Sequence, residues 1–259
     1  MAPVSGPAPP PAPGATALRL VGLHKAFDGQ PVLRGVDLAI RAGESLTIMG
    51  GSGTGKSVLL RCMIGLLKPD AGQVFVEDQD IAPLSEAALL LVRRGIGMVF
   101  QGSALFDSMS VGENVAFALR EHTELSEAKI AERVGTVLEW LGLSGTEAMD
   151  PAALSGGMRK RVAMARAIAL PPRILLYDEP TTGLDPATVE KITDLILDLK
   201  RRLGITSVVV THDMQSAAKV SDRLAMLHDG RIAAVGTPEE IRSSHDSLIR
   251  EFMEGRLAQ

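Results

Sequence analysis

The sequence predicts an α/β fold, on three observations. Residues 45–49 have the length and apolar character of a buried strand, and they run directly into a glycine cluster. The apolar residues among 58–63 then have the spacing of a helix, and a strand, a glycine loop and a helix make one turn of an α/β fold. Strand-like runs return at 174–177 and 207–210, and the residues between them have a helical pattern that stops at Gly204.

The composition is that of an ordinary globular protein, with 46% hydrophobic and 22% charged residues among 259. The formal net charge of −4 argues against duplex nucleic acid as the main partner, because the phosphate backbone selects basic surfaces. The single cysteine, Cys62, excludes an internal disulfide and is expected to be a small buried hydrophobe.

No run of residues approaches the ~18 to 20 continuous apolar residues that cross a bilayer. The amino terminus also lacks the basic patch and apolar stretch of a signal peptide. Any connection to a membrane is therefore expected to come through a partner.

The first predicted segment is a tail, because six of the fifteen prolines lie within the first 13 residues. Such a stretch buries little, so residues 1–17 are expected to be a disordered, partly polyproline-II tail. Short apolar runs at 18–21, 31–33 and 36–40 then predict strands separated by glycine-containing turns.

The middle of the chain, about residues 105–170, is predicted to be mostly helical. Ser110 and Glu113 form the pattern of a capping box, and Ser126 is expected to cap a second helix. Towards the end, Asp229-Gly230 lies between two apolar runs and predicts a β-hairpin. Apolar residues among 248–253 predict a short amphipathic helix.

Residues 50–57 match the phosphate-loop pattern G-x-x-x-x-G-K-[ST]. Glycines let successive backbone N–H groups turn towards phosphates, and the helix that begins near Lys56 adds its positive end. Lys56 is expected to reach the β- and γ-phosphates of a nucleotide, and the Ser57 hydroxyl to bind Mg²⁺. The residues expected to hold ATP here are Gly50, Gly51, Ser52, Gly53, Thr54, Gly55, Lys56, Ser57 and Val58.

Two further patterns fall in the second half of the chain. The apolar strand at 174–177 leads into Asp178 and Glu179, which are either solvated turn residues or a pair that holds Mg²⁺ and polarises water. Ser155, Gly156 and Gly157 open a helix and are either a plain turn or a second anion site. Two such glycine turns with one nucleotide site suggest that the second serves ATP held by a partner copy.

The set of motifs resembles the ATP-binding-cassette family over about residues 18–255. The resemblance implies a P-loop NTPase (RecA-like) core with an N-terminal antiparallel β subdomain and an inserted α-helical subdomain at about 105–170. It makes Gln101 the Q-loop glutamine and a magnesium ligand, Asp185 the D-loop aspartate and His212 the switch histidine. Phe27, 23 residues before Gly50, corresponds to the aromatic residue that stacks on adenine, although it could also be a core residue.

By the same resemblance the catalytic residues are Glu179, His212, Lys56 and Gln101. Asp178 is expected to be a further magnesium ligand. ATP is expected to be contacted also by Ser155, Gly156, Gly157 and Asp185. His24, His122, His228 and His245 have no such context and are assigned no catalysis. The signature departs from the family at Met158, where glutamine is usual.

The form Leu-Ser-Gly-Gly-Met at 154–158 is similar to the ATPases of Mla/Mce-type phospholipid transporters, as are residues 101–106 and 113–123. This similarity implies a homodimer on the cytoplasmic face of the inner membrane, held by permease subunits. A small accessory subunit and a lipid-binding protein could belong to the same system. The alternatives are the ATPase of a polar-solute, amino-acid-type importer and a soluble cassette ATPase without a membrane partner.

Overall fold

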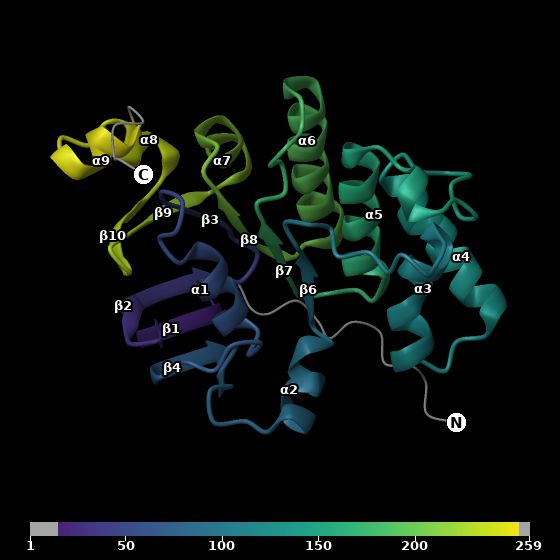
Figure 1. The fold of residues 1–259 in the computed structure, drawn as a ribbon, viewed down its shortest axis with the longest axis horizontal. Helices are drawn as coiled ribbons and strands as arrows, with labels where there is room; N and C mark the ends of the chain where they lie inside the picture. The colour runs from purple at the N-terminus through teal and green to yellow at the C-terminus, as the bar shows by residue number, and fades with distance from the viewer. Residues whose placement is uncertain (1–14, 254–259) are drawn as a thin grey trace.

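The computed structural model describes residues 15–253, and its centre is a six-stranded sheet with the strand order β10-β9-β3-β8-β7-β6 (Figure 1). The pairings β9-β3, β3-β8, β8-β7 and β7-β6 are parallel, and the edge strand β10 runs antiparallel to β9. The strands are β3 (Ser45–Met49), β6 (Ile96–Val99), β7 (Ile174–Asp178), β8 (Thr206–Thr211), β9 (Arg223–His228) and β10 (Arg231–Gly236).

Both faces of this sheet are covered, so every residue of the inner strands β3, β7 and β8 is buried. Leu175 and Tyr177 of β7 and Val209 of β8 pack into a core with the helices that follow β6. The alternate residues, such as Leu176 and Val208, pack on the other side against the amino-terminal part of the chain. The predicted α/β core is therefore confirmed.

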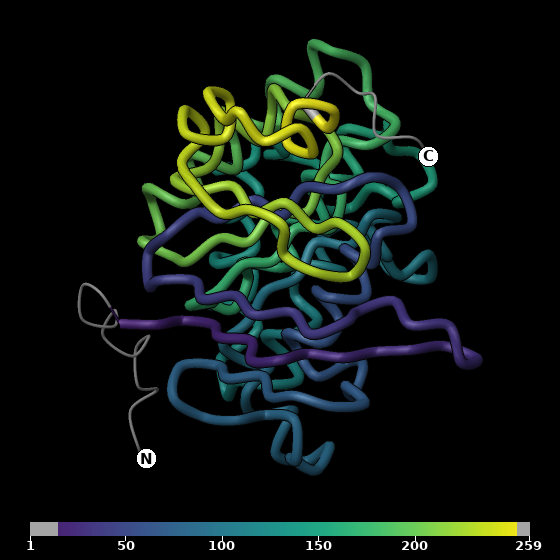
Figure 2. The backbone as a smooth tube through the Cα atoms, turned by 90° about the vertical axis from the view of Figure 1, so that its left-hand side faces the viewer, coloured from purple at the N-terminus to yellow at the C-terminus, as the bar shows by residue number. Residues whose placement is uncertain are grey.

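The amino-terminal part forms a second, antiparallel sheet with the order β2-β1-β4-β5. Figure 2 shows its long hairpin, and β2 lies beside β10 there, where the Arg34 N–H donates to the Gly230 carbonyl at 2.8 Å. The strands are β1 (Thr16–Phe27), β2 (Gln30–Arg41), β4 (Ala71–Val76) and β5 (Gln79–Asp80), and helix α1 (Lys56–Met63) packs between this part and the central sheet.

The predicted short runs at 18–21, 31–33 and 36–40 are parts of only two strands, β1 and β2. Gly22 and Gly35 do not end the strands, because each takes a positive φ at or beside a register shift and the pairing continues beyond it. The turn itself lies at Asp28-Gly29.

Helices cover the face of the central sheet that lies opposite α1 and the antiparallel sheet. Most of these helices fall within residues 105–170, the region predicted to be helical. Ser110 caps α3 with a complete capping box, as predicted, whereas Ser126 occupies the N-cap of α4 without a side-chain capping bond. The helices are α3 (Val111–His122), α4 (Glu127–Trp140), the 3₁₀ turn at Pro151–Ala153, α5 (Gly156–Ala169) and α6 (Pro186–Leu203).

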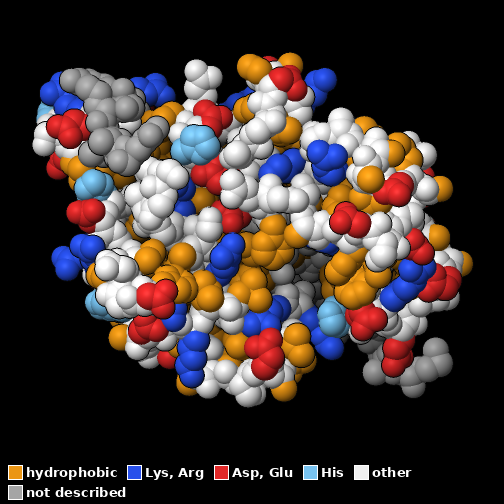
Figure 3. Space-filling view, viewed as in Figure 1, with side chains coloured by type: hydrophobic (Ala, Val, Ile, Leu, Met, Phe, Trp, Pro, Cys, Tyr) orange, Lys and Arg blue, Asp and Glu red, His pale blue; other side chains and the backbone are white. Residues whose placement is uncertain are grey.

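A groove of about 390 Å³ lies between this helical layer and α2 (Glu86–Arg93), a helix that the sequence pattern did not predict. Figure 3 shows a hollow in this region, with hydrophobic side chains around it. Leu90, Phe106 and Phe117 supply apolar lining, and Arg166 of α5 lines the groove as well.

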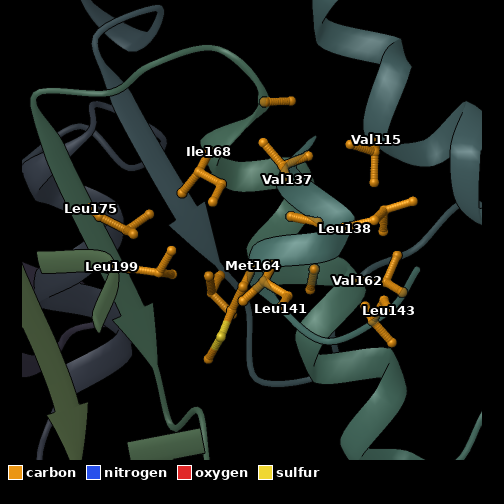
Figure 4. Packing of buried hydrophobic residues seen from close by; sticks show 14 of the residues in the cluster. Val115, Val137, Leu138, Leu141, Leu143, Val162, Met164, Ile168, Leu175 and Leu199 are labelled. Atoms are coloured by element: carbon orange, nitrogen blue, oxygen red, sulfur yellow. The ribbon is translucent and has the colours of Figure 1, made fainter. Parts of the chain in front are cut away.

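The core of the helical layer forms where α3, α4 and α5 meet the sheet. Figure 4 shows Val115, Leu138 and Val162 from the three helices pointing towards one another, while Leu175 lies on the strand beside them. Burial of such branched side chains stabilises the fold by about 25 cal/mol per Å² of apolar surface. The helical layer is thus fixed to the sheet by packing.

The carboxyl-terminal part returns to the sheet through a hairpin and short helices. The hairpin predicted at Asp229-Gly230 is confirmed, because it joins β9 to β10. The predicted terminal helix is also present, as α9 (Ser247–Met253), and the remaining helices are α7 (Met214–Val220) and α8 (Pro238–Arg242).

Strand β1 begins slightly earlier than predicted. Strand β1 starts at Thr16, which pairs with Arg41, so the pairing with β2 reaches two residues beyond the expected start at 18. Residues 1–14, most of the predicted proline-rich tail, lie outside the described residues. Cys62 is buried, as expected.

Between residues 15 and 253, no helix is both long enough and apolar enough to span a bilayer.

We expect Gly97→Ala to destabilise the protein, because an added Cβ would lie 2.4 Å from the Ala167 carbonyl oxygen. The shifts that remove such a clash typically lower the free energy of unfolding by about 1–3 kcal/mol. The matched control is Gly135→Ala within α4, where an added Cβ has nothing within 4 Å and should stabilise the helix by about 0.5–1 kcal/mol. Urea unfolding followed by the fluorescence of Trp140, the single tryptophan, measures both; equal stability of the two variants would contradict the packing.

Candidate functional site

The glycine cluster at residues 50–57 forms a tight loop between β3 and α1. Gly55 has a φ of 97°, and a Cβ there would lie 2.8 Å from Val32 Cγ1. A Cβ on Gly50 would lie 2.5 Å from the Leu227 carbonyl oxygen. These two positions therefore accept only glycine, and the loop turns its backbone round the start of α1.

Lys56 lies across this loop, and its Nζ donates to the carbonyl oxygens of Gly50 at 2.9 Å and Gly51 at 2.8 Å. The side chain is buried. Burial lowers the pKa of Lys56, and the nearby charges of Glu179 and Asp178 oppose that shift. The ammonium is thus desolvated, its hydrogen-bond partners are two carbonyl groups, and a Glu179 carboxylate oxygen lies 4.0 Å away. Such an incompletely compensated positive charge attracts an anion.

The two carboxylates reach the loop because of strand order. Asp178 ends β7 opposite Val210 of β8, and β8 in turn pairs with β3, so that Met49 lies opposite Thr211. Parallel strands end at one edge of the sheet, which is where ligands bind in open α/β sheets. The phosphate loop, the carboxylates and His212 are therefore brought to the same edge.

Ser57 and Asp178 place two oxygen atoms together at this edge. The Ser57 hydroxyl donates to Asp178 Oδ1 at 2.8 Å. Burial raises the pKa of Asp178, while the bond from Ser57 opposes that shift. A hydroxyl and a carboxylate are the hard oxygen ligands that Mg²⁺ prefers. Mg²⁺ is usually bound through one or two carboxylates together with substrate phosphates and water, and this pair of oxygen atoms fits such a site.

Glu179 occupies an unusual backbone position with a φ of 47°, which is rarely adopted by residues with a side chain. Its N–H donates to the Val210 carbonyl at 2.9 Å. Carboxylate Oε2 accepts from the Thr182 hydroxyl at 3.0 Å and lies 2.9 Å from His212 Nδ1. The other oxygen, Oε1, faces Lys56 Nζ at 4.0 Å.

Lys56, Glu179, Thr182 and His212 line one cleft of about 640 Å³, whereas Asp178 is not on its wall and contacts Ser57, which is. Phe27, at the end of β1, and Gln101, just after β6, also line it, and 42% of the surface of Phe27 is exposed. The predicted residues on the cleft wall are Phe27, Ser52, Gly53, Gly55, Lys56, Ser57, Val58, Gln101, Glu179 and His212. Sequence analysis missed Thr182, although its place in the turn just after the acidic pair was a usable signal.

The structure does not bring Ser155, Gly157 and Asp185 to this cleft. Ser155 caps α5 and accepts from the Met158 N–H at 3.3 Å, and Asp185 caps α6 and accepts from the Thr188 N–H at 3.0 Å. Ser155 and Gly157 line a different hollow of about 540 Å³. One chain thus holds two glycine turns that line separate hollows.

Lys160, in the second turn of α5, was also missed by sequence analysis. Its Nζ donates to the carbonyl oxygens of Gln101 and Glu179. It lies between two other basic residues, Arg159 and Arg161, and nothing in the local pattern marks it as buried.

The sequence of this chain matches a protein family and several known proteins. A family model described as ABC transporter matches residues 33–182. The probable ribonucleotide transport ATP-binding protein mkl of Mycobacterium leprae is 40% identical over 244 residues, 94% of this chain and 70% of that protein.

Two other relatives are named for different cargoes. The intermembrane phospholipid transport system ATP-binding protein MlaF of Haemophilus influenzae is 42% identical over 220 residues, 85% of this chain and 83% of that protein. The methionine import ATP-binding protein MetN of Caulobacter vibrioides is 45% identical over 216 residues, 83% of this chain and 65% of that protein.

The fold has close counterparts among solved structures. The ATP-binding cassette MJ0796, as a dimer in a post-hydrolysis state bound to ADP and Pi, is 34% identical and superposes with a TM-score of 0.80. The match covers 85% of this chain and 98% of that one.

Proposed function

The chain belongs to the ABC transporter family, and we propose that it supplies the ATP hydrolysis that moves phospholipid between membranes. It is the ATP-binding subunit of a transporter and an ATPase. The observation that carries the catalytic part of the proposal is the cleft in which Lys56, Glu179 and His212 converge. The cargo, the residue roles and the partners are proposals.

The triphosphate of ATP would lie along residues 50–58. Backbone N–H groups of Gly51, Ser52, Gly53 and Thr54 would contact its oxygens, and Lys56 would exchange its two carbonyl partners for the β- and γ-phosphates. Phe27 is exposed at the mouth of the cleft, where its ring can stack on adenine.

Ser57, Asp178 and Gln101 would hold the magnesium ion that accompanies ATP. Such an ion neutralises charge on the phosphate oxygens. The protein's own contribution is to fix the hydroxyl and the carboxylate 2.8 Å apart in a buried corner.

Glu179 would act as the general base. Its Oε2 is occupied by Thr182 and His212, whereas Oε1 has only the Lys56 ammonium at 4.0 Å, so Oε1 is the atom that can accept a proton from water. His212 has 63% of its side-chain surface exposed, and from this position it can contact the γ-phosphate while its Nδ1 orients Glu179.

We propose that the working unit is a homodimer, as in the related solved cassette. Ser155, Gly156 and Gly157 lie at the N-terminus of α5, where a helix binds anions, and Asp185 lies at the N-terminus of α6. Because these groups do not line their own chain's cleft, they would contact the ATP held by the partner. ATP would then favour the closed dimer by contacting both halves.

Permease subunits would bind at the groove beside α2, which would hold the chain at the cytoplasmic face of the inner membrane. The groove exposes Leu90, Phe106 and Phe117, and large exposed apolar patches mark interaction sites. Two of these residues fall in segments 101–106 and 113–123, which resemble phospholipid transporters. A small accessory subunit and a lipid-binding protein would complete such a system.

A polar-solute importer is the second candidate, because the methionine importer subunit MetN is 45% identical over 216 residues. The signature ending in Met158 and the two segments at the groove favour phospholipid instead.

We expect Glu179→Gln to lower ATP turnover by about 100-fold or more, because an amide cannot accept the proton of water. ATP binding should persist and trap a dimer, which size-exclusion chromatography with ATP would detect. Glu190→Gln, a change of an exposed glutamate on α6, is the control and should leave turnover unchanged. Phosphate release near the wild-type rate would remove Glu179 from the role of base.

The cargo is tested by purifying the full chain with its membrane partners in mild detergent and identifying the permease and bound lipid by mass spectrometry. We expect integral membrane subunits with bound phospholipid, and ATP-dependent phospholipid transfer between vesicles by the complex. Stimulation of ATPase activity by an amino acid and its binding protein would support the importer instead. Purification without any integral membrane subunit would support the soluble alternative.

A further inference from the structure

Lys160 is a buried ammonium whose hydrogen-bond partners are backbone carbonyl groups. Only 5% of its surface is exposed, and its Nζ donates to the carbonyl oxygens of Gln101 and, at 3.3 Å, Glu179. Between residues 15 and 253 no carboxylate forms an ion pair with it. Burial lowers its pKa, and the more distant charges of Asp178 and Glu179 oppose the shift. Because a buried charge needs compensation, the two carbonyl dipoles are what hold this ammonium in place.

The contact with Glu179 fixes a strained peptide. Glu179 has a positive φ, and such a conformation persists only where its surroundings over-determine it. Its N–H is held by Val210, and its carbonyl group precedes Pro180, so the following peptide has no N–H of its own. The Lys160 ammonium and a long contact from the Thr182 N–H at 3.4 Å are the donors to that carbonyl. Lys160 therefore helps to hold the backbone that carries the carboxylate, whose Oε2 lies against Thr182 and His212.

The contact with Gln101 fixes the segment that follows β6. Ser103 and Ala104 are both in the left-handed region, with φ of 63° and 48°. Arg166, two turns beyond Lys160 on α5, donates to the carbonyl oxygens of both, at 2.9 Å and 2.6 Å. Two side chains of α5, Lys160 and Arg166, thus donate hydrogen bonds to carbonyl groups within residues 101–104, and Lys160 also donates to the Glu179 carbonyl.

We infer that Lys160 is a positioning residue for ATP hydrolysis, which ties the backbone of Glu179 and Gln101 to α5 and so sets the position of the Glu179 carboxylate. This inference rests on the proposed role of Glu179 as the base. Lys160 is not among the residues that line the cleft, so it acts through the two backbones and does not touch the nucleotide. Its loss should slow the chemical step and leave ATP binding intact, because small displacements of a catalytic group cost rate.

The test is steady-state ATP hydrolysis by the full-length wild-type protein and by Lys160→Met, which keeps the side chain's length but removes its donors. We expect kcat to fall by about 10-fold or more, with KM for ATP within about twofold of the wild type. Lys160→Arg, which restores a cation with several donors, should recover most of the loss in kcat. A variant that only folds less well would also lower the apparent kcat at unchanged KM, so kcat is expressed per folded molecule, with the folded fraction taken from Trp140 fluorescence.

Lys129→Met, a change of an exposed lysine on α4, is the matched control and should leave kcat unchanged. Trp140 fluorescence reports whether each variant is folded. If Lys160→Met does not fold, Lys160→Gln replaces it, with an expected loss of about threefold or more because the amide is neutral and its side chain is shorter than that of lysine. A kcat within twofold of the wild type in the folded variant, or an arginine variant as slow as the methionine variant, would overturn the inference. An inactive wild-type protein would instead remove the proposed function itself.

Discussion

Parallel pairing of β3, β8 and β7 is the constraint on which the site depends. The register places Met49 opposite Thr211 and Val210 opposite Asp178, so three strands end at the same edge of the sheet. The loop after the first strand supplies an ammonium, and the loops after the other two supply a histidine and two carboxylates. Lys56 and Asp178 are buried together there, and each is a charge that the protein must compensate.

The same topology separates the two glycine turns. Residues 50–57 open α1, which packs on one side of the central sheet, whereas residues 155–157 open α5 on the other side (Figure 1). The first turn lines the cleft with Glu179, and the second lines a hollow beside α6. In our proposal a nucleotide in one chain therefore meets Phe27 and residues 50–58 of that chain, and a second copy supplies Ser155, Gly156, Gly157 and Asp185.

Ten of the residues predicted from sequence for the site line one cleft, whereas parts of the surrounding fold were not predicted. Residues 50–57 and 174–179 are found from sequence because their chemistry needs fixed residue types at fixed spacing. Helix α2 was missed because its apolar run at 89–92 is short enough to be a strand as well as part of a helix. Gly22 and Gly35 were taken for turns, since sequence alone does not distinguish a bulge from the end of a strand.

Lys160 illustrates a different limit. Its neighbours Arg159 and Arg161 are equally basic, and only the contacts of α5 with Gln101 and Glu179 decide that the middle cation is buried. Such contacts depend on residues 19 and 59 positions away, which no local pattern encodes.

The central claim is that each ATP is held by two chains, and complementation between two inactive variants tests it most directly. Lys56→Ala disables the phosphate loop, and Ser155→Asp keeps a good helix cap but adds a negative charge that repels phosphate. In a mixed dimer both defects fall on one shared site, and the other site is intact. Mixing the two inactive variants should therefore restore up to about a quarter of the wild-type ATPase rate, since about half of the dimers are mixed. A mixture as inactive as its components would contradict the account.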